Sequence, residues 1–263
     1  MSLPFSWGRA RAVFWKDFLD LRKNRGLLAS MTALPIMLVL VPAGVVWAYA
    51  RQPDDPNLQV IARYYEANVA GADAVRFLID KVLVDWFAVY LIMPVFVPIL
   101  VSSFAIAGEK ERRTLEPLLA SPVSGLELLI GKSLASLVPA IVICIAAFGL
   151  LCVTVDVAAG AAVLPTPMWT FGVFVIAPLF AFFGNGVAVV ISGRVGDSRL
   201  AQQLAGMTVL PLVGLAAGQF GGFLKAGFSY YLLITAFVLV LDVALLVAAT
   251  RLFDRERLMT KWG

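Results

Sequence analysis

The sequence predicts an all-α, polytopic membrane protein that forms a single transmembrane domain over residues 1–263. Hydrophobic residues make up 61% of the 263 residues and charged residues only 14%, well below the roughly 25% that is usual in soluble proteins. The apolar residues form long blocks, and a helix needs roughly 20 of them to cross a bilayer. We expect six blocks to span the membrane, at 27–49, 86–107, 128–155, 168–192, 204–224 and 230–250.

Residues 5–25 are expected to form an interfacial helix that lies flat on the membrane. One face of this helix is apolar and the opposite face is charged. The apolar face carries Trp7, Phe14, Phe18 and Leu21, and the charged face carries Arg9, Lys16, Asp20 and Lys23. Basic residues in this arrangement meet anionic lipid headgroups. A soluble packing helix is the alternative, but a spanning block follows directly, which favours the membrane surface.

The distribution of Lys and Arg predicts the orientation in the membrane. If the N-terminus is inside, the inner segments carry 16 Lys and Arg residues and the outer segments carry 5. The positive-inside rule then places both termini in the cytoplasm, together with the charged islands 108–127 and 193–203. The long polar connection 51–81 becomes an outer loop, with room for one or two short surface helices.

The island 108–127 cannot be buried in lipid and is expected to contain a short surface helix. Thr114 can cap this helix, with Pro117 in the first turn, where its missing N–H costs nothing. Ser124 and Glu127 have the spacing of a capping box and should begin the next spanning helix. A charged helix held between two spanning helices is an element that a soluble partner can push. The alternative is a plain solvated hairpin loop.

From Glu109 to Lys132 the sequence resembles the cytoplasmic loop of type-two ABC (ATP-binding cassette) exporter permeases. The run GEKERRTLEPLLASPV, followed by Gly131 and Lys132, carries the likeness. In that family this loop contains a coupling helix that docks on the ATPase subunit, and the chain begins with a cytoplasmic elbow helix. The segment GRVGDSRLAQQ at 193–203 resembles the family's second cytoplasmic loop. The segment RLFDRERLMTKW at 251–262 resembles its C-terminal signature.

The resemblance implies the permease subunit of an ATP-driven exporter in a bacterial or archaeal plasma membrane. Two copies, or one copy and a paralogue, would form the translocation pathway, and two separate ABC ATPase subunits would bind from the cytoplasm. Those subunits would hold ATP and Mg²⁺, so we expect this chain to hold no cofactor or metal and to have no enzymatic activity. The docking residues implied by the resemblance are Glu109, Glu111, Arg112, Arg113, Thr114, Leu115, Glu116, Arg194, Asp197 and Arg199.

The composition excludes several kinds of chemistry. The chain has no histidine, which removes His-based metal sites, His proton relays and Ser–His hydrolysis. Gly125, Gly131 and Lys132 superficially resemble a phosphate-binding loop, but five residues separate the glycines and no strand precedes them, unlike the Walker A motif. Lys132 is expected instead to snorkel toward the inner surface. The modest net charge of +4 does not favour nucleic-acid binding.

Two polar residues within the spans are candidates for pathway lining or helix contacts. Asp242 lies in the sixth span, where a charged side chain costs about 2.5–3.5 kcal/mol on insertion scales and normally faces protein or water. One interpretation is that Asp242 lines a cavity or takes part in coupling. The other is that it is a hydrogen-bonded packing site, close enough to the inner surface to meet water or Arg251. We favour packing. Asn185 is either a hydrogen-bonding helix contact or a cavity-lining group, and packing is again favoured.

Three alternative functions are an ion-coupled secondary carrier, an intramembrane enzyme and a non-transporting assembly subunit. A carrier needs several intramembrane acids or basic partners, and this chain offers essentially Asp242. An intramembrane enzyme needs a cluster of catalytic groups within the spans, and the sequence displays none. An assembly subunit would keep the docking loop without a pathway, so the sequence leaves that alternative open.

Overall fold

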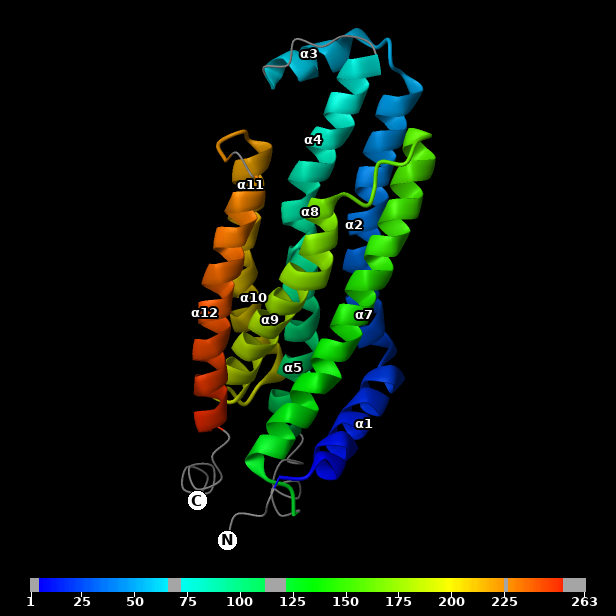
Figure 1. Cartoon of the computed structure of the whole chain (residues 1–263). Helices are drawn as coiled ribbons and strands as arrows, with labels where there is room; N and C mark the ends of the chain where they lie inside the picture. The colour runs from blue at the N-terminus through cyan, green and yellow to red at the C-terminus, as the bar shows by residue number, and fades with distance from the viewer. Residues whose placement is uncertain (1–4, 66–71, 112–121, 225–226, 253–263) are drawn as a thin grey trace.

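The computed structural model describes residues 5–65, 72–111, 122–224 and 227–252, and all secondary-structure elements among them are helical (Figure 1). In the first half of the chain these are α1 (Trp7–Lys23), α2 (Arg25–Arg51), α3 (Pro56–Tyr64), α4 (Ala72–Tyr90) and α5 (Ile92–Glu111). In the second half they are α7 (Gly125–Ala159), α8 (Pro167–Phe171), α9 (Ala177–Ser192), α10 (Ser198–Gly206), α11 (Leu210–Phe220) and α12 (Phe228–Leu252).

Six described helical segments are long and apolar enough to cross a membrane, which confirms the predicted all-α, polytopic class. Three of them are single helices, namely α2, α7 and α12. In the others two helices run on almost continuously: α4 into α5, α8 into α9 through a π-helical turn, and α10 into α11 through a 3₁₀ turn. The helix α7 begins at a complete capping box of Ser124 and Glu127, as the sequence predicts.

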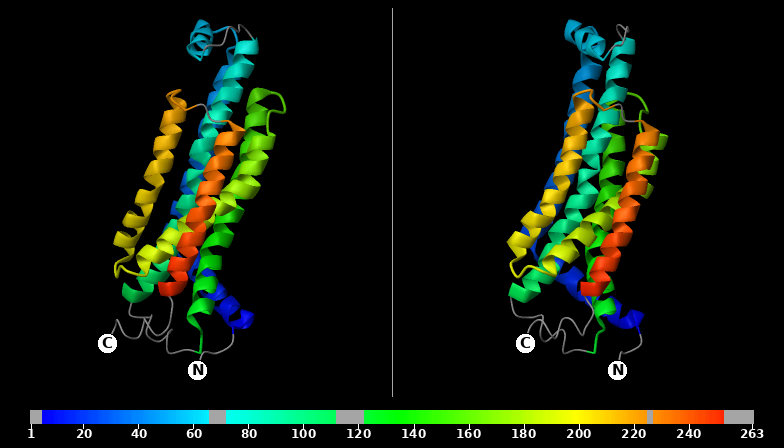
Figure 2. Two further views of the ribbon diagram at one scale, coloured as in Figure 1. Left: turned by 60° about the vertical axis from the view of Figure 1, so that its left-hand side comes forward. Right: turned by 90° about the vertical axis from the view of Figure 1, so that its left-hand side faces the viewer.

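One end of the bundle gathers segments that are far apart in the sequence, and we call it the charged end. It comprises α1, residues 109–111 at the end of α5, residues 125–132 at the start of α7, and the turn 193–198 between α9 and α10. Figures 1 and 2 show these segments at the same end, with α3 at the opposite end. Both charged islands predicted from the sequence therefore begin and end on one side of the bundle.

The helical segment that contains the predicted second span, 86–107, begins well before that span. The helix α4 starts at Ala72, so the predicted outer loop 51–81 consists largely of α3 and the first turns of α4. Lys81 and Asp85 lie one helical turn apart, and the Lys81 Nζ is 2.6 Å from both carboxylate oxygens of Asp85. A hydropathy profile scores Lys81 and Asp85 as two polar residues, although in the helix each neutralises the charge of the other. The helix α4 therefore includes residues that the sequence analysis had assigned to a polar loop.

The helix α5 lies at the centre of the bundle and α12 at its edge. Three quarters (75%) of the most apolar window in the α4–α5 segment is buried, compared with 11% in α12. Met93, Val95, Val97 and Ile99 of α5 are fully buried in the main hydrophobic core. The exposed apolar surface of α12 is consistent with contact with lipid or with another protein chain.

The helices α5 and α9 approach each other closely at Gly184. A Cβ atom at this position would overlap the backbone of Val95, including its carbonyl oxygen. By contrast, a Cβ atom on Gly149 of α7 would meet nothing within 4 Å. The contact between α5 and α9 therefore depends on the missing side chain of Gly184.

We expect Gly184→Ala to lower the thermal stability of the purified protein in detergent. Overpacking of this kind costs about 1–3 kcal/mol, whereas Gly149→Ala should be neutral or stabilising, because alanine favours a helix over glycine by about 1 kcal/mol. Thermal unfolding followed by circular dichroism measures both variants. Equal melting temperatures for the two would contradict the close contact.

Candidate functional site

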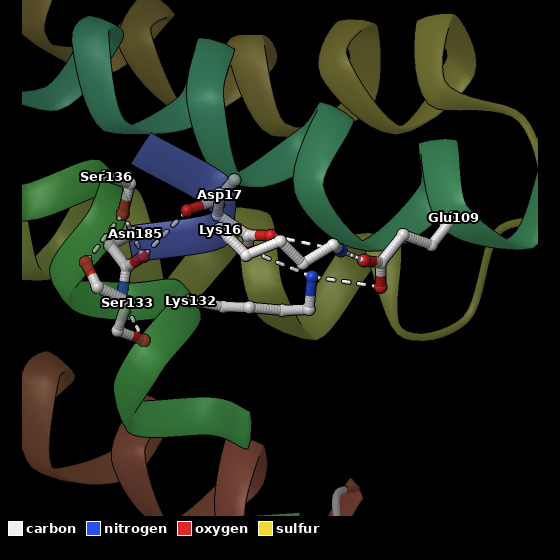
Figure 3. A network of polar contacts seen from close by, with 8 residues as sticks. Lys16, Asp17, Glu109, Lys132, Ser133, Ser136 and Asn185 are labelled. Atoms are coloured by element: carbon white, nitrogen blue, oxygen red, sulfur yellow. Dashed lines mark hydrogen bonds and ion pairs between the residues drawn. The ribbon is translucent and has the colours of Figure 1, made fainter. Parts of the chain in front are cut away.

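Four charged side chains from three helices form a cluster at the charged end (Figure 3). They are Lys16 and Asp17 of α1, Glu109 of α5 and Lys132 of α7. The Lys132 Nζ lies 3.0 Å from an oxygen of Asp17 and 2.9 Å from an oxygen of Glu109. The Lys16 Nζ lies 2.5 Å from the other oxygen of Glu109 and 3.3 Å from Asp17. This four-charge cluster holds α1 against α5 and α7.

Lys132, Asp17 and Glu109 are largely enclosed and Lys16 is half-exposed, so the enclosed charges depend on one another. The Lys132 side chain is 2% exposed and that of Glu109 is 11% exposed. Burial alone would lower the pKa of Lys16, but the hydrogen bond and negative charge of Glu109, together with Asp17, raise it overall. Removing one partner of a buried pair leaves an uncompensated charge, which costs about 3–5 kcal/mol.

A second ion pair joins α1 to the first turn of α7. The Arg9 guanidinium donates to Glu127, with nitrogen–oxygen distances of 2.7 and 2.9 Å. The fully buried Glu127 carboxylate also accepts hydrogen bonds from the backbone N–H groups of Ser6, at 2.6 Å, and Ser124, at 2.8 Å. Glu127 therefore caps its own helix and anchors α1 with the same carboxylate.

The end of α5 also contacts the second charged island. The Glu111 carboxylate accepts a hydrogen bond of 2.8 Å from the hydroxyl of Ser198, the first residue of α10. Asp197 caps α10 by accepting hydrogen bonds from the backbone N–H groups of Arg199 and Leu200. Arg194 and Arg199 are exposed. The last turn of α5 is thus bound to α1 through Glu109 and to α10 through Glu111.

The predicted docking residues fall into two groups. Glu109, Glu111, Arg194, Asp197 and Arg199 lie at the charged end, Glu109 buried and the others exposed. The predicted short helix and five of the docking residues lie outside the described residues. These are Arg112, Arg113, Thr114, Leu115 and Glu116.

The sequence prediction was wrong about the surroundings of Lys132. Instead of snorkelling to the surface, Lys132 is buried and paired with Asp17 and Glu109. Arg9 and Lys16, assigned to a headgroup-facing surface, also turn toward acidic partners on other helices. A lysine one to two turns inside an apolar span needs a buried partner, so the sequence indicated that Lys132 is paired but not which residues pair with it.

Asn185 connects three helices deeper in the bundle (Figure 3). Its amide oxygen accepts hydrogen bonds of 2.7 Å from the hydroxyls of Ser102 on α5 and Ser136 on α7. Its amide nitrogen donates to the Ser133 hydroxyl on α7 at 3.0 Å. The sequence analysis singled out Asn185 but none of these serines, because small polar residues are common in spanning helices and their partners are distant in sequence.

Asp242 of α12 lines a pocket of about 260 Å³ between α7, α9 and α12. Both carboxylate oxygens are buried, and neither has a hydrogen-bond partner within the described part of the chain. The hydrogen-bonded packing that the sequence analysis favoured is therefore not observed among those residues. In the same described residues, no group of three or more His, Cys, Asp or Glu side chains is placed to hold a metal ion.

We expect Lys132→Met to lower the free energy of unfolding by about 3–5 kcal/mol, because it leaves buried carboxylates without their main counter-ion. Adding Glu109→Gln should recover part of the loss, since the cost arises from the unpaired charge. Arg194→Met removes an exposed cation at the same end and should change stability by no more than about 0.5 kcal/mol. Thermal unfolding in detergent compares the three. If Lys132→Met is tolerated as well as Arg194→Met, the cluster is not stabilising.

Comparison with known proteins identifies the family to which the chain belongs. No curated protein sequence matches the chain significantly. The sequence model of ABC-2 family transporter proteins matches residues 11–231. This match includes most of α1, the four-charge cluster, Asn185 and the first turn of α12, and it covers well over half of the chain. The chain therefore belongs to the ABC-2 transporter family and is a multi-pass membrane permease component of an ABC transporter.

Proposed function

We propose that this chain is the permease subunit of an ATP-driven ABC exporter, which forms the translocation pathway as a dimer and is driven by two separate ATPase subunits. A second copy or a paralogue completes the dimer. The ATPases bind ATP and Mg²⁺ and hydrolyse the ATP. This chain undergoes the conformational change that moves the substrate. The membrane is a bacterial or archaeal plasma membrane, with both termini in the cytoplasm.

The observation that supports coupling most directly is the attachment of α1 to both helices that flank residues 112–121. Glu109, near the end of α5, pairs with Lys16 and Lys132. Glu127, at the start of α7, pairs with Arg9. A force applied to the connection between α5 and α7 therefore acts on three helices that are held together by buried ion pairs. Elements of this kind move as rigid bodies in transport cycles.

The contact between Glu111 and Ser198 extends the same path to the second island. The helix α10 begins at this contact and continues into α11. An ATPase that touched both islands would act on α5, α7 and α10 together. This arrangement favours a lever that opens and closes the bundle at the charged end.

Two alternatives make different predictions about energy supply. An ion-coupled carrier would transport without an ATPase, using Asp242 as its main intramembrane acid. A non-transporting assembly subunit would bind the ATPase but move no substrate. The ion pairs that join α1 to the end of α5 and the start of α7 favour coupling to a partner over ion coupling, because their buried carboxylates Glu109 and Glu127 already have counter-ions.

The docking proposal is tested by co-purification with candidate ABC ATPases from the same organism. We expect reversing the charge at two of the predicted docking residues, in Arg113→Glu with Glu116→Lys, to weaken the complex at least tenfold and to abolish stimulated ATP hydrolysis. Glu109 is avoided because its replacement would break the buried cluster.

The matched control is Asp54→Lys, which reverses an exposed charge at the opposite end of the bundle and should leave the complex intact. Thermal unfolding verifies that all variants are folded. A complex and a turnover that are unchanged by the loop reversals would refute docking at this loop.

The orientation is tested separately with single cysteines and a membrane-impermeant thiol reagent in intact cells. We expect Asp54→Cys to react from outside and Gly196→Cys to react only after the cells are opened, because the positive-inside rule places the charged end in the cytoplasm. Both positions are exposed, and a side chain at Gly196 meets no neighbour within 4 Å. The native cysteines Cys144 and Cys152 are replaced by alanine in both. The reverse pattern of labelling would invert the topology and with it the site of ATPase docking.

A further inference from the structure

The pocket between α7, α9 and α12 is apolar except at a few points. Its walls are formed mainly by aliphatic and aromatic side chains, including Leu129, Phe182 and Leu246. The polar side chains that line it are Ser133, Asn185 and Asp242. Asn185 and Ser133 are hydrogen-bonded to each other. Asp242 is therefore the one ionisable side chain among the described lining residues.

Asp242 differs from the other buried carboxylates among the described residues. Asp85 is paired with Lys81, Glu109 with Lys16 and Lys132, and Glu127 with Arg9. Each of these carboxylates has a cation within 3 Å. The oxygens of Asp242 are equally inaccessible but have no partner in the described structure. Among the described residues, the fold supplies counter-ions for the other buried acids and leaves this one, which lines a pocket, without a partner.

The position of Asp242 along α12 makes a counter-ion from the chain itself hard to supply. It lies about three turns, or about 15 Å, before the end of the helix at Leu252. The lining residues described include no Lys or Arg, and the chain has no histidine. The described lining thus offers no cation to this carboxylate, and its apolar walls suit a ligand that combines a cation with an apolar body.

We infer that the pocket binds an amphipathic cation, an apolar molecule with a protonated amine, and that the amine pairs with Asp242. The apolar walls of α7, α9 and α12 would hold the body of the ligand, and the single carboxylate would fix its orientation. This combination of an apolar cavity with one well-placed polar group is typical of small-molecule sites. A buried ammonium donating to a buried carboxylate also removes the unpaired charge from each.

The inference that this ligand is a transported substrate rests on the proposed function. Binding of the ligand can be measured on this chain alone. The test therefore uses the purified full-length chain without any ATPase, in nanodiscs of zwitterionic phosphatidylcholine. A failure of the ATPase-docking experiment would leave the binding result unaffected, and a failure of binding would leave the docking proposal standing.

The probes share one apolar body and differ in the head group: 4-phenylbutylammonium, 4-phenylbutanol and 4-phenylbutanoate. Binding is measured by titration with saturation-transfer difference NMR, and empty nanodiscs provide the blank. We expect the ammonium probe to bind the unmodified chain at least tenfold more tightly than the alcohol, and the carboxylate probe to bind more weakly than either. Asp242→Asn keeps the shape of the side chain and should reduce the affinity for the ammonium probe to that for the alcohol.

Asp80→Asn is the matched control, because it removes an exposed carboxylate from another spanning segment, and it should bind all three probes as the unmodified chain does. The affinities of the three probes for the unmodified chain test the inference even if Asp242→Asn folds poorly. Equal affinity for ammonium and alcohol, or a preference that survives Asp242→Asn, would overturn the inference. It would also be overturned if no probe bound and Asp242→Asn changed the fraction of dimer in light scattering, because the pocket would then be covered by a second copy of the chain.

Discussion

The structure depends on the neutralisation of buried charge where α1 meets the ends of α5 and α7. Lys132 and Glu127 both lie within the first turns of a spanning helix and are almost fully buried. Neither could remain charged there without a partner, since an isolated ion in a low-dielectric interior is very costly. Their partners come from α1 and α5, which are distant in sequence. Satisfying these charges therefore determines how the ends of three helices are placed.

The same constraint separates the helices that are joined by polar networks from a helix that takes part in neither network. At the charged end, ion pairs connect α1, α5 and α7, and a hydrogen bond from Ser198 to Glu111 adds α10. Deeper in the bundle, Asn185 connects α5, α7 and α9 through three serines. The helix α12 takes part in neither network and carries Asp242, which has no partner among the described residues. In the mechanism proposed above, the networked helices would form the lever, and the pocket lies where α7 and α9 meet α12.

Much of the fold was predictable from the sequence because hydropathy and helix caps are local signals. The six spans, the capping box of Ser124 and Glu127, and the gathering of both islands at one end follow from such signals. The early start of α4 was missed, because the i,i+4 pair of Lys81 and Asp85 makes a spanning helix look polar in a hydropathy profile. The four-charge cluster was missed for a different reason. Lys132 pairs with residues of α1 and α5, and only the three-dimensional arrangement brings them together.

The central claim is that α1, α5 and α7 move as one body at the charged end when the transporter binds ATP. Pulsed electron–electron double resonance between spin labels at Arg11 of α1 and Leu126 of α7, both exposed, tests it in the complex with the ATPase. The account predicts an unchanged distance between Arg11 and Leu126 with and without a non-hydrolysable ATP analogue, while the distance between the Leu126 labels of the two copies changes. A change in the distance between Arg11 and Leu126 on nucleotide binding would contradict it.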